Sequence, residues 1–321
     1  MKPVEIQSLL ERESGLRMAR DVSLHRHTSI GIGGPAALFA QVDDPSALAI
    51  LLSTAVGHSI PVFILGGGTN LLVSDDGFYG LVIRPAFDGL KEGDGWIRAG
   101  AAVPAAGLVA HAVERGLGGL AFAAGLPGTV GGAVAGNAGC FGSSFGERLR
   151  AATIVTADGR VEEVKNEWFE FDYRHSAVAR KGAVIVDVTL SVAPGDVESL
   201  RRTAEEHIAL RRTKHPAAGT RTAGSWFKNL PPLSPGEFRR PAGALLEQVG
   251  ARGECVGDAV VFEKHANIFV NRGSASAADM LALERRLRER VEERFGECLE
   301  TEVRFVGNRP VLPEAGSRVQ A

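Results

Sequence analysis

Cysteine is scarce in this 321-residue chain. The three cysteines, Cys140, Cys255 and Cys298, lie far apart, and no CxxC pair occurs. A zinc knuckle needs closely spaced cysteines, and a disulfide framework needs an even set at regular spacing. The sequence therefore predicts no bound metal and three reduced thiols, which is typical of a cytoplasmic protein.

An excess of charge and long apolar runs are also lacking. The 36 basic and 38 acidic residues leave a net charge of −2, so no overall basic field attracts nucleic acid or anionic lipid. No apolar run reaches the roughly 18 residues of a membrane helix. The charged start, MKPVEIQSLLERESG, has too short an apolar stretch for a secretory signal. We expect no nucleic-acid or membrane partner and no obligate protein partner.

Glycine, in contrast, is abundant, at 40 residues, where the usual share is about 7%. In ILGGGTNLL, Gly66–Gly68 follow an apolar strand, and the exposed backbone N–H groups of such a turn can hold a pyrophosphate. A second cluster, 125–139, has six glycines within the segment GLPGTVGGAVAGNAGCFG, which interleaves glycine with Leu, Val, Ala and Phe and suits close packing against a flat or phosphorylated ligand. Taken alone, the first cluster is more often a purely structural turn, and the second is as consistent with a structural role as with ligand binding.

Neither of the common nucleotide-binding motifs is present. The dinucleotide fingerprint needs a long helix after its glycines, whereas LLV resumes strand character after Thr69-Asn70. The absence of any GK[ST] sequence excludes the phosphate loop of nucleotide triphosphatases. If these glycines bind a nucleotide cofactor, they do so in a loop of another kind.

Capping residues and apolar periodicity predict mixed helices and strands. Asp44 before Pro45 starts one helix, the apolar spacing over 197–212 predicts another, and Ser276 with Asp279 opens a third that ends at Gly296. The sequence TIVTADGRVEEV predicts a β-hairpin with a type I′ turn at Asp158-Gly159, and LETEVRFV predicts a strand over 299–306.

Breaks in these patterns divide the chain. Pro and Gly in APGD interrupt a strand near 193–196. We expect the following segments: a helix and linker over 1–24, a first domain over 25–195 with lobes of about 25–85 and 86–195, a second domain over 196–307, and a polar tail over 308–321.

Polar residues suited to catalysis are scattered along the chain. They are Tyr173, Arg174, Lys214, Ser225, His265 and Glu302. Each has an ordinary structural interpretation, since Arg174 can be a surface cation, Ser225 a turn residue and His265 a packed histidine. Alternation also places Glu300, Glu302 and Arg304 together on one face of the last strand, where they can be simply solvated.

The order and spelling of six segments are more specific than any single motif. HTSIGIGGPA, ILGGGTNLLVSDDGFYGLVI, GLAFAAGLPGTVGGAVAGNAGCFG, FDYRHS, AGSWFKN and LETEVRFVG, spread over roughly 20–307, closely resemble the UDP-N-acetylenolpyruvoylglucosamine reductase family. That family uses FAD and NADPH to complete UDP-N-acetylmuramate for bacterial peptidoglycan, and so serves cell-wall biogenesis, cell shape and cell division. The short interval from Arg174 to Ser225 resembles the compact subclass that lacks an extra tyrosine-bearing loop.

The resemblance implies an α+β protein. Its N-terminal part is expected to be a two-lobed FAD-binding fold of the vanillyl-alcohol-oxidase and cresol-methylhydroxylase type, followed by an α+β substrate domain. The residues expected to hold non-covalent FAD are Gly66, Gly67, Gly68, Thr69, Asn70, Leu71, Gly125, Pro127, Gly128 and Thr129.

The resemblance also assigns roles to the polar residues. Arg174 is expected to stabilise negative charge on the substrate, Ser225 to donate a proton, and Glu302 to position or polarise the same group. Glu302 is favoured over Glu300 because it directly precedes VRF. Residues expected to hold the nucleotide-sugar substrate are Tyr173, Lys214, Asn229 and His265.

Two departures and two alternatives accompany this assignment. Gly31 stands where relatives often carry a larger or basic residue, and Trp226 stands where Phe or Ile is more common. One alternative is another FAD-dependent oxidoreductase of the same class acting on a small alcohol or hydroxy acid, although SWFKN and LETEVRF argue against its different substrate cap. The other, a non-catalytic flavin- or nucleotide-sugar-binding protein, would be expected to lose the polar triad.

Overall fold

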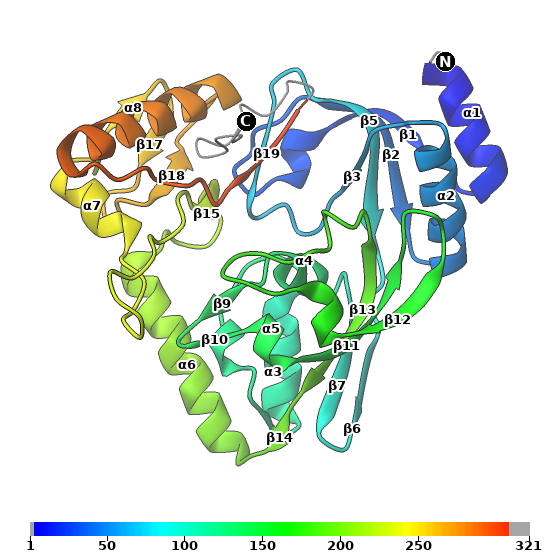
Figure 1. The fold of residues 1–321 in the computed structure, drawn as a ribbon, viewed down its shortest axis with the longest axis horizontal. Coiled ribbons are helices and arrows are strands. Elements are labelled where there is room, and N and C mark those ends of the chain that lie inside the picture. The colour runs from blue at the N-terminus through cyan, green and yellow to red at the C-terminus, as the bar shows by residue number, and fades with distance from the viewer. Residues whose placement is uncertain (1–2, 308–321) are drawn as a thin grey trace, which may run out of the picture.

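The computed structural model describes residues 3–307, so the tail expected over 308–321 lies outside the described residues. Three parts surround a central region (Figure 1). The first lobe has the strand order β1-β2-β5-β3, in which β2, β5 and β3 run parallel and β1 is an antiparallel edge. Its elements are α1 (Pro3–Ser14), β1 (Ala19–Ser23), η1 (Leu24–His27), β2 (Pro35–Val42), α2 (Pro45–Gly57), β3 (Val62–Ile64), β4 (Leu71–Val73) and β5 (Phe78–Pro85).

Local sequence explains much of this lobe. The Asp44 side chain accepts a hydrogen bond from Ala47 N at 2.7 Å and starts α2 as predicted. The expected linker differs, because residues 19–23 pair with β2 as strand β1. An exposed edge strand carries few apolar residues, so its sequence resembles that of a loop.

The second lobe is a five-stranded antiparallel sheet in the order β12-β11-β13-β7-β6. Its buried face packs against short helices in the largest of the described apolar cores. The elements are β6 (Leu90–Gly93), β7 (Trp96–Gly100), α3 (Ala105–Glu114), β8 (Leu117–Gly118), η2 (Ala121–Ala123), α4 (Val130–Ala135), β9 (Gly139–Cys140), β10 (Ser143–Ser144), α5 (Phe145–Arg148), β11 (Leu149–Val155), β12 (Val161–Lys165), η3 (Asn166–Phe169), β13 (Val184–Ser191) and β14 (Ala193–Pro194).

The predicted hairpin is present, but its turn is not type I′. β11 and β12 pair up to Val155 and Val161, which leaves a five-residue connection. A type I′ turn needs positive φ at both central residues, whereas Gly159 has φ +83° and Asp158 is not among the residues with positive φ. The prediction of the hairpin was confirmed and that of its turn type was wrong.

Helix α6 (Val197–Lys214) runs from the end of the second lobe at β14 toward the third part (Figure 1). Asp196 caps it through Ser199 N at 2.9 Å. Ala204 and Ile208 pack into the core of the second lobe, although we expected this helix in the substrate domain. The apolar face is narrow, and the sequence alone does not show which neighbour buries it.

The third part is an antiparallel sheet in the order β15-β18-β17-β16, covered by two helices. Its elements are β15 (Thr222–Ser225), α7 (Ala242–Gln248), β16 (Cys255–Val256), β17 (Ala259–Val261), β18 (Ile268–Asn271) and α8 (Ala277–Phe295). The capping box of Ser276 with Asp279 and a left-handed Gly296, at φ +67°, bound α8 as predicted. Its core also takes in Ile30 and Ile32 from the first lobe.

The chain finally returns to the first lobe. Strand β19 (Arg304–Val306) runs parallel to β4, with Arg304 opposite Leu71, and Figure 1 shows it crossing between the third part and the first lobe. The predicted strand over 299–306 is therefore shorter than expected, since residues 300–302 instead bond to the segment after β15. Within residues 3–307, no helix combines the length and apolar character needed to cross a membrane.

Candidate active site

The two glycine clusters pack directly against each other. A Cβ on Gly67 would lie 2.7 Å from Gly128 Cα and 3.1 Å from Thr129 N. Gly68 has φ +66°, and a Cβ there would lie 1.9 Å from the carbonyl oxygen of His27. Backbone meets backbone at both places, so only glycine fits. The two segments predicted to hold FAD thus form one surface.

The remaining residues predicted for FAD surround this contact. Thr129 caps α4, with Oγ1 accepting from Gly132 N at 3.4 Å, and Thr69 Oγ1 lies against Gly128. Asn70 links the loop to the last segment of the chain, because its Nδ2 donates to the Glu302 carbonyl at 3.1 Å. Leu71 lies buried in β4. Gly125 has φ +70° and faces α6, beside the Arg211 side chain, and Pro127 precedes Gly128.

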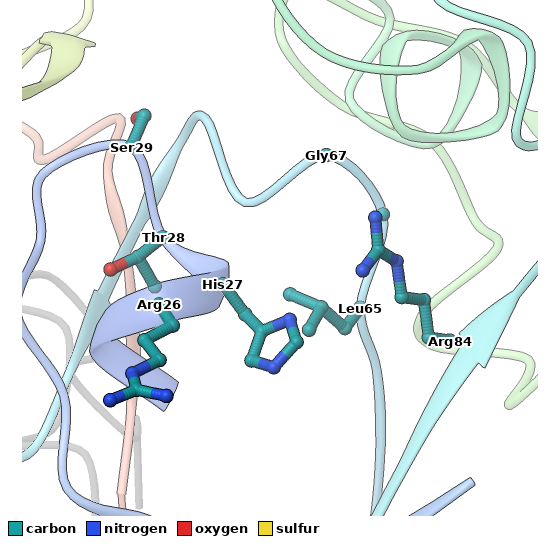
Figure 2. A pocket seen from close by; sticks show the side chains of 8 residues that line it. Arg26, His27, Thr28, Ser29, Leu65, Gly67 and Arg84 are labelled. Atoms are coloured by element: carbon teal, nitrogen blue, oxygen red, sulfur yellow. The ribbon is translucent and has the colours of Figure 1, made fainter. Parts of the chain in front are cut away.

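A cavity of about 230 Å³ opens beside this surface. Figure 2 shows the His27 ring between the 26–29 segment and the glycine loop, and the Arg84 side chain against the other side of the 65–67 segment. Burial, then Arg84 and His25, lower the pKa of His27 from its usual 6.5, so the ring is neutral at pH 7. The complete lining is Arg26, His27, Thr28, Ser29, Leu65, Gly66, Gly67 and Arg84.

This lining fits the pyrophosphate of FAD. Two cations, exposed loop backbone and a surface without side chains suit a bulky anionic cofactor. Arg26 and Arg84 were not among the predicted residues. Arg84 lies at the end of an ordinary strand, and no motif marks it. The turn-rich segment HTSIGIGGPA did indicate a possible binding loop for the residues from His27 onwards.

Arg174 and Glu302 form an ion pair from opposite ends of the chain. Arg174 Nε lies 2.9 Å from Glu302 Oε1, and Arg174 Nη2 donates to the Gly139 carbonyl at 2.9 Å. Both side chains are largely buried, 26% and 18% exposed. Arg174 has φ +53°, a left-handed conformation that is uncommon for a residue with a side chain. The site therefore holds this guanidinium in a fixed place.

Burial raises the pKa of Glu302 above its usual value, although Arg174 and then Lys228 oppose the shift. Glu300 differs, since its side chain is 64% exposed and pairs with Lys228. Only Glu302 of these two glutamates contacts Arg174. Of the two glutamates, Glu302 is thus the one whose carboxyl is buried and paired within the site.

Ser225 lies on the segment next to Glu302. It ends β15 opposite Ile268, and the carbonyl of Trp226 accepts from Glu302 N at 2.8 Å. Thr301 also bridges to Phe227. No hydrogen bond of Ser225 Oγ occurs among residues 3–307, so within these residues its hydroxyl is not committed to a protein acceptor.

The predicted substrate residues fall into two groups. Asn229 N donates to Tyr173 Oη at 3.3 Å, which joins these two beside Arg174. Lys214 is exposed at the end of α6. The pKa of the half-buried His265 is lowered first by burial and then by the positive charge of Lys214. Both groups reach α7: Ala242 N donates to Asn229 Oδ1 at 3.3 Å, and a Cβ on Gly243 would lie 3.6 Å from His265 Cε1.

His215 belongs to the second group and was not predicted. Its ring centroid lies 5.6 Å from that of His265. Burial, then Arg211, His265 and Lys214, lower the pKa of His215 to about 4. The motif TKHP places His215 next to Lys214, which is the signal that was available.

A two-lobed fold with a glycine-built anion site, joined to a third part that contributes polar residues, is the arrangement of an FAD-dependent oxidoreductase. Residues 36–165 match the family described as "FAD binding domain". Residues 215–306 match "UDP-N-acetylenolpyruvoylglucosamine reductase, C-terminal domain". The chain belongs to the UDP-N-acetylenolpyruvoylglucosamine reductase family. The predicted family, α+β fold class and FAD-binding domain are confirmed.

Several relatives support this assignment over nearly the whole chain. UDP-N-acetylenolpyruvoylglucosamine reductase 2 of Symbiobacterium thermophilum is 41% identical over 299 residues, covering 92% of this chain and 94% of the relative. The reductase of Heliobacterium modesticaldum is 42% identical over 287 residues, 89% of each chain. The crystal structure of the reductase from Thermus caldophilus, 33% identical, superposes with a TM-score of 0.77 over 91% of this chain and 100% of that one.

Proposed function

We propose that this protein reduces UDP-N-acetylglucosamine enolpyruvate to UDP-N-acetylmuramate, using non-covalently bound FAD and NADPH. It does so in the cytoplasm, for peptidoglycan synthesis and hence for cell shape and division. The Arg174–Glu302 pair beside the Ser225 segment carries this proposal, because it places a fixed cation and a hydroxyl on adjacent segments. The names of the relatives support the choice of substrate.

The glycine surface and its flanking cations are the FAD site of this proposal. The loop 66–68, Gly128 and Thr129 would lie against the cofactor, and Arg26 and Arg84 would offset the charge of its pyrophosphate. Bound FAD supplies two-electron transfer from NADPH to the enolpyruvyl double bond. The chain itself supplies binding, orientation and charge.

Arg174 is the residue that lowers the barrier electrostatically. Reduction of the enolpyruvyl group builds negative charge toward its carboxylate, and a preorganised guanidinium stabilises that charge in the transition state. The hydrogen bonds to Glu302 and Gly139 hold Arg174 in place before substrate arrives. Burial raises the pKa of Glu302 and Arg174 opposes that shift, so the carboxyl and the guanidinium act directly on each other.

Ser225 completes the reaction by donating its hydroxyl proton to the carbon that carries the carboxylate. A serine hydroxyl is a weak acid, so the role depends on the charge around it. Ser225 stands on the strand end that bonds through Trp226 to the Glu302 segment. This placement brings the proton donor and the charged pair to one side of the site.

The two half-reactions of the holoenzyme test the proposal separately. The flavin absorbance should bleach on adding NADPH and recover anaerobically on adding the enolpyruvyl sugar nucleotide. Ser225→Ala should leave bleaching nearly unchanged and slow recovery by roughly 10²-fold or more. Bleaching without recovery in the wild type would reject this substrate, and equal slowing of both steps in the variant would reject the proton-donor role. Flavin that stays with acid-denatured protein would contradict non-covalent binding.

A further inference from the structure

The loop from Leu230 to Arg240 is closed at its base beside the site. Leu230 N donates to Arg240 O at 2.9 Å, and Arg240 N donates to Leu230 O at 3.0 Å. Arg240 also pairs with Glu297 at 2.6 Å. Phe238, near the end of the loop, is 97% exposed. The two ends of the loop are thus anchored to the third part, and Arg239 lies directly beside one of these ends.

Arg239 lies over the ring of Tyr173. Its guanidinium carbon is 3.9 Å from the ring centroid. Arg239 Nε and Nη2 both donate to the Asn229 carbonyl, at 3.2 Å and 3.0 Å, and Asn229 N donates to Tyr173 Oη. Arg239 is therefore joined to two residues that were predicted from sequence to hold the substrate, although nothing in the sequence distinguished it.

The charge of Arg239 has no carboxylate partner among residues 3–307. Arg174 pairs with Glu302 and Arg240 with Glu297, whereas Arg239 contacts only a carbonyl and an aromatic face. Its side chain is half-buried. A partly desolvated guanidinium held flat on a ring, with N–H donors left over, is suited to binding an anion from solution.

The position favours a phosphate group over a carboxylate. Arg174 also lies near the Tyr173 ring, with its guanidinium carbon 5.2 Å from the centroid, and it is tied to the Ser225 side of the site through Glu302. A nucleotide-sugar ether has a carboxylate at the reacting end and a diphosphate at the other end of the sugar. Two guanidinium groups around one tyrosine can therefore receive the two anionic ends of one molecule.

We propose that Arg239 binds the diphosphate of the nucleotide-sugar substrate, with Tyr173 and Asn229 holding the guanidinium in place. This inference rests on the proposed function for the identity of the substrate. The planar guanidinium can donate to two phosphate oxygens at once, so Arg239 would fix the orientation of the diphosphate. Arg174 stays assigned to the reacting end.

UDP is the probe, because it carries the diphosphate and no carboxylate. Calorimetric titration of the holoenzyme with UDP should show affinity weakened roughly tenfold to hundredfold in Arg239→Ala, the range for losing charge-assisted hydrogen bonds. Arg239→Lys should recover little, because a point charge does not reproduce the paired contacts. Flavin absorbance and melting temperature of the two purified variants check that each is folded and carries its cofactor.

Phe238→Ala is the matched control, since it alters the same loop without removing charge. Its UDP affinity should equal that of the wild type. Wild-type UDP affinity in Arg239→Ala, or equal weakening in Phe238→Ala, would overturn the inference. If the wild type binds UDP through Arg239 but does not reduce the enolpyruvyl substrate, the proposed function fails and the diphosphate site stands.

Discussion

Replacing Glu302 by Gln tests the electrostatics of the site most directly. The amide keeps the shape of the side chain but removes the negative charge that pairs with Arg174 at 2.9 Å. Arg174 then has only neutral acceptors, the amide oxygen and the Gly139 carbonyl, so its guanidinium is held less firmly. We expect the substrate-driven recovery of flavin absorbance to slow by about 10²- to 10³-fold, the range seen when one electrostatic stabiliser is removed. Bleaching by NADPH should be unaffected.

The same substitution should act in the opposite direction on stability. The folded protein raises the pKa of Glu302, so this group contributes stability that is present below its unfolded pKa and lost as pH rises through the folded pKa. Gln resembles the protonated form at every pH. Glu302→Gln should therefore melt at the wild-type temperature in acid and at a higher temperature than the wild type near pH 8.

Glu300→Gln is the control for both measurements. Its side chain is 64% exposed and pairs with Lys228 on the surface, where an ion pair contributes little. Activity should be that of the wild type. Equal losses in the two variants, or full activity in Glu302→Gln, would refute the reasoning from burial and charge.

Three further predictions follow from the geometry. Gly68→Ala should abolish flavin binding, seen as loss of visible absorbance, because its Cβ would lie 1.9 Å from a carbonyl oxygen; Gly136→Ala, whose nearest contact is 3.5 Å away, should keep it. Asp75→Ala should lower the free energy of unfolding in urea by about 1 kcal/mol, because Asp75 accepts from the first two N–H groups of α8 at 2.8 Å and 3.2 Å; an unchanged urea midpoint would contradict this. The pKa of His215, lowered to about 4, means that stability present above pH 6.5 is lost as pH falls toward 4; His215→Gln should flatten that part of the urea-derived profile, and an unchanged slope would exclude His215 as its source.

Local features of the chain were predictable because their causes lie within a few residues. Asp44 and Ser276 start their helices through hydrogen bonds to the backbone three residues ahead. Gly296 ends α8 because glycine adopts positive φ without strain. The type I′ turn at Asp158-Gly159 was wrong for a related reason, since Asp-Gly is compatible with more than one turn, and the strand register selected a longer connection.

Edges and boundaries were less predictable because they depend on what packs nearby. Strand β1 has an exposed, polar sequence, and only its pairing with β2 makes it a strand. Helix α6 has an apolar stripe that the sequence shows, yet its burial against the second lobe was not visible. The last strand was predicted too long, because residues 300–302 bond to the Trp226 segment before β19 begins.

The sequence by itself determined the family, the glycine clusters, the helix caps and the residue types available for catalysis, because motifs and backbone preferences are local. Only the tertiary structure decided that Arg174 meets Glu302, 128 positions away, that Arg84 faces the glycine loop, and that Arg239 lies on Tyr173. Such contacts join segments whose separation in the chain carries no information about their separation in space. Their geometry follows from how the three parts of the fold pack against one another.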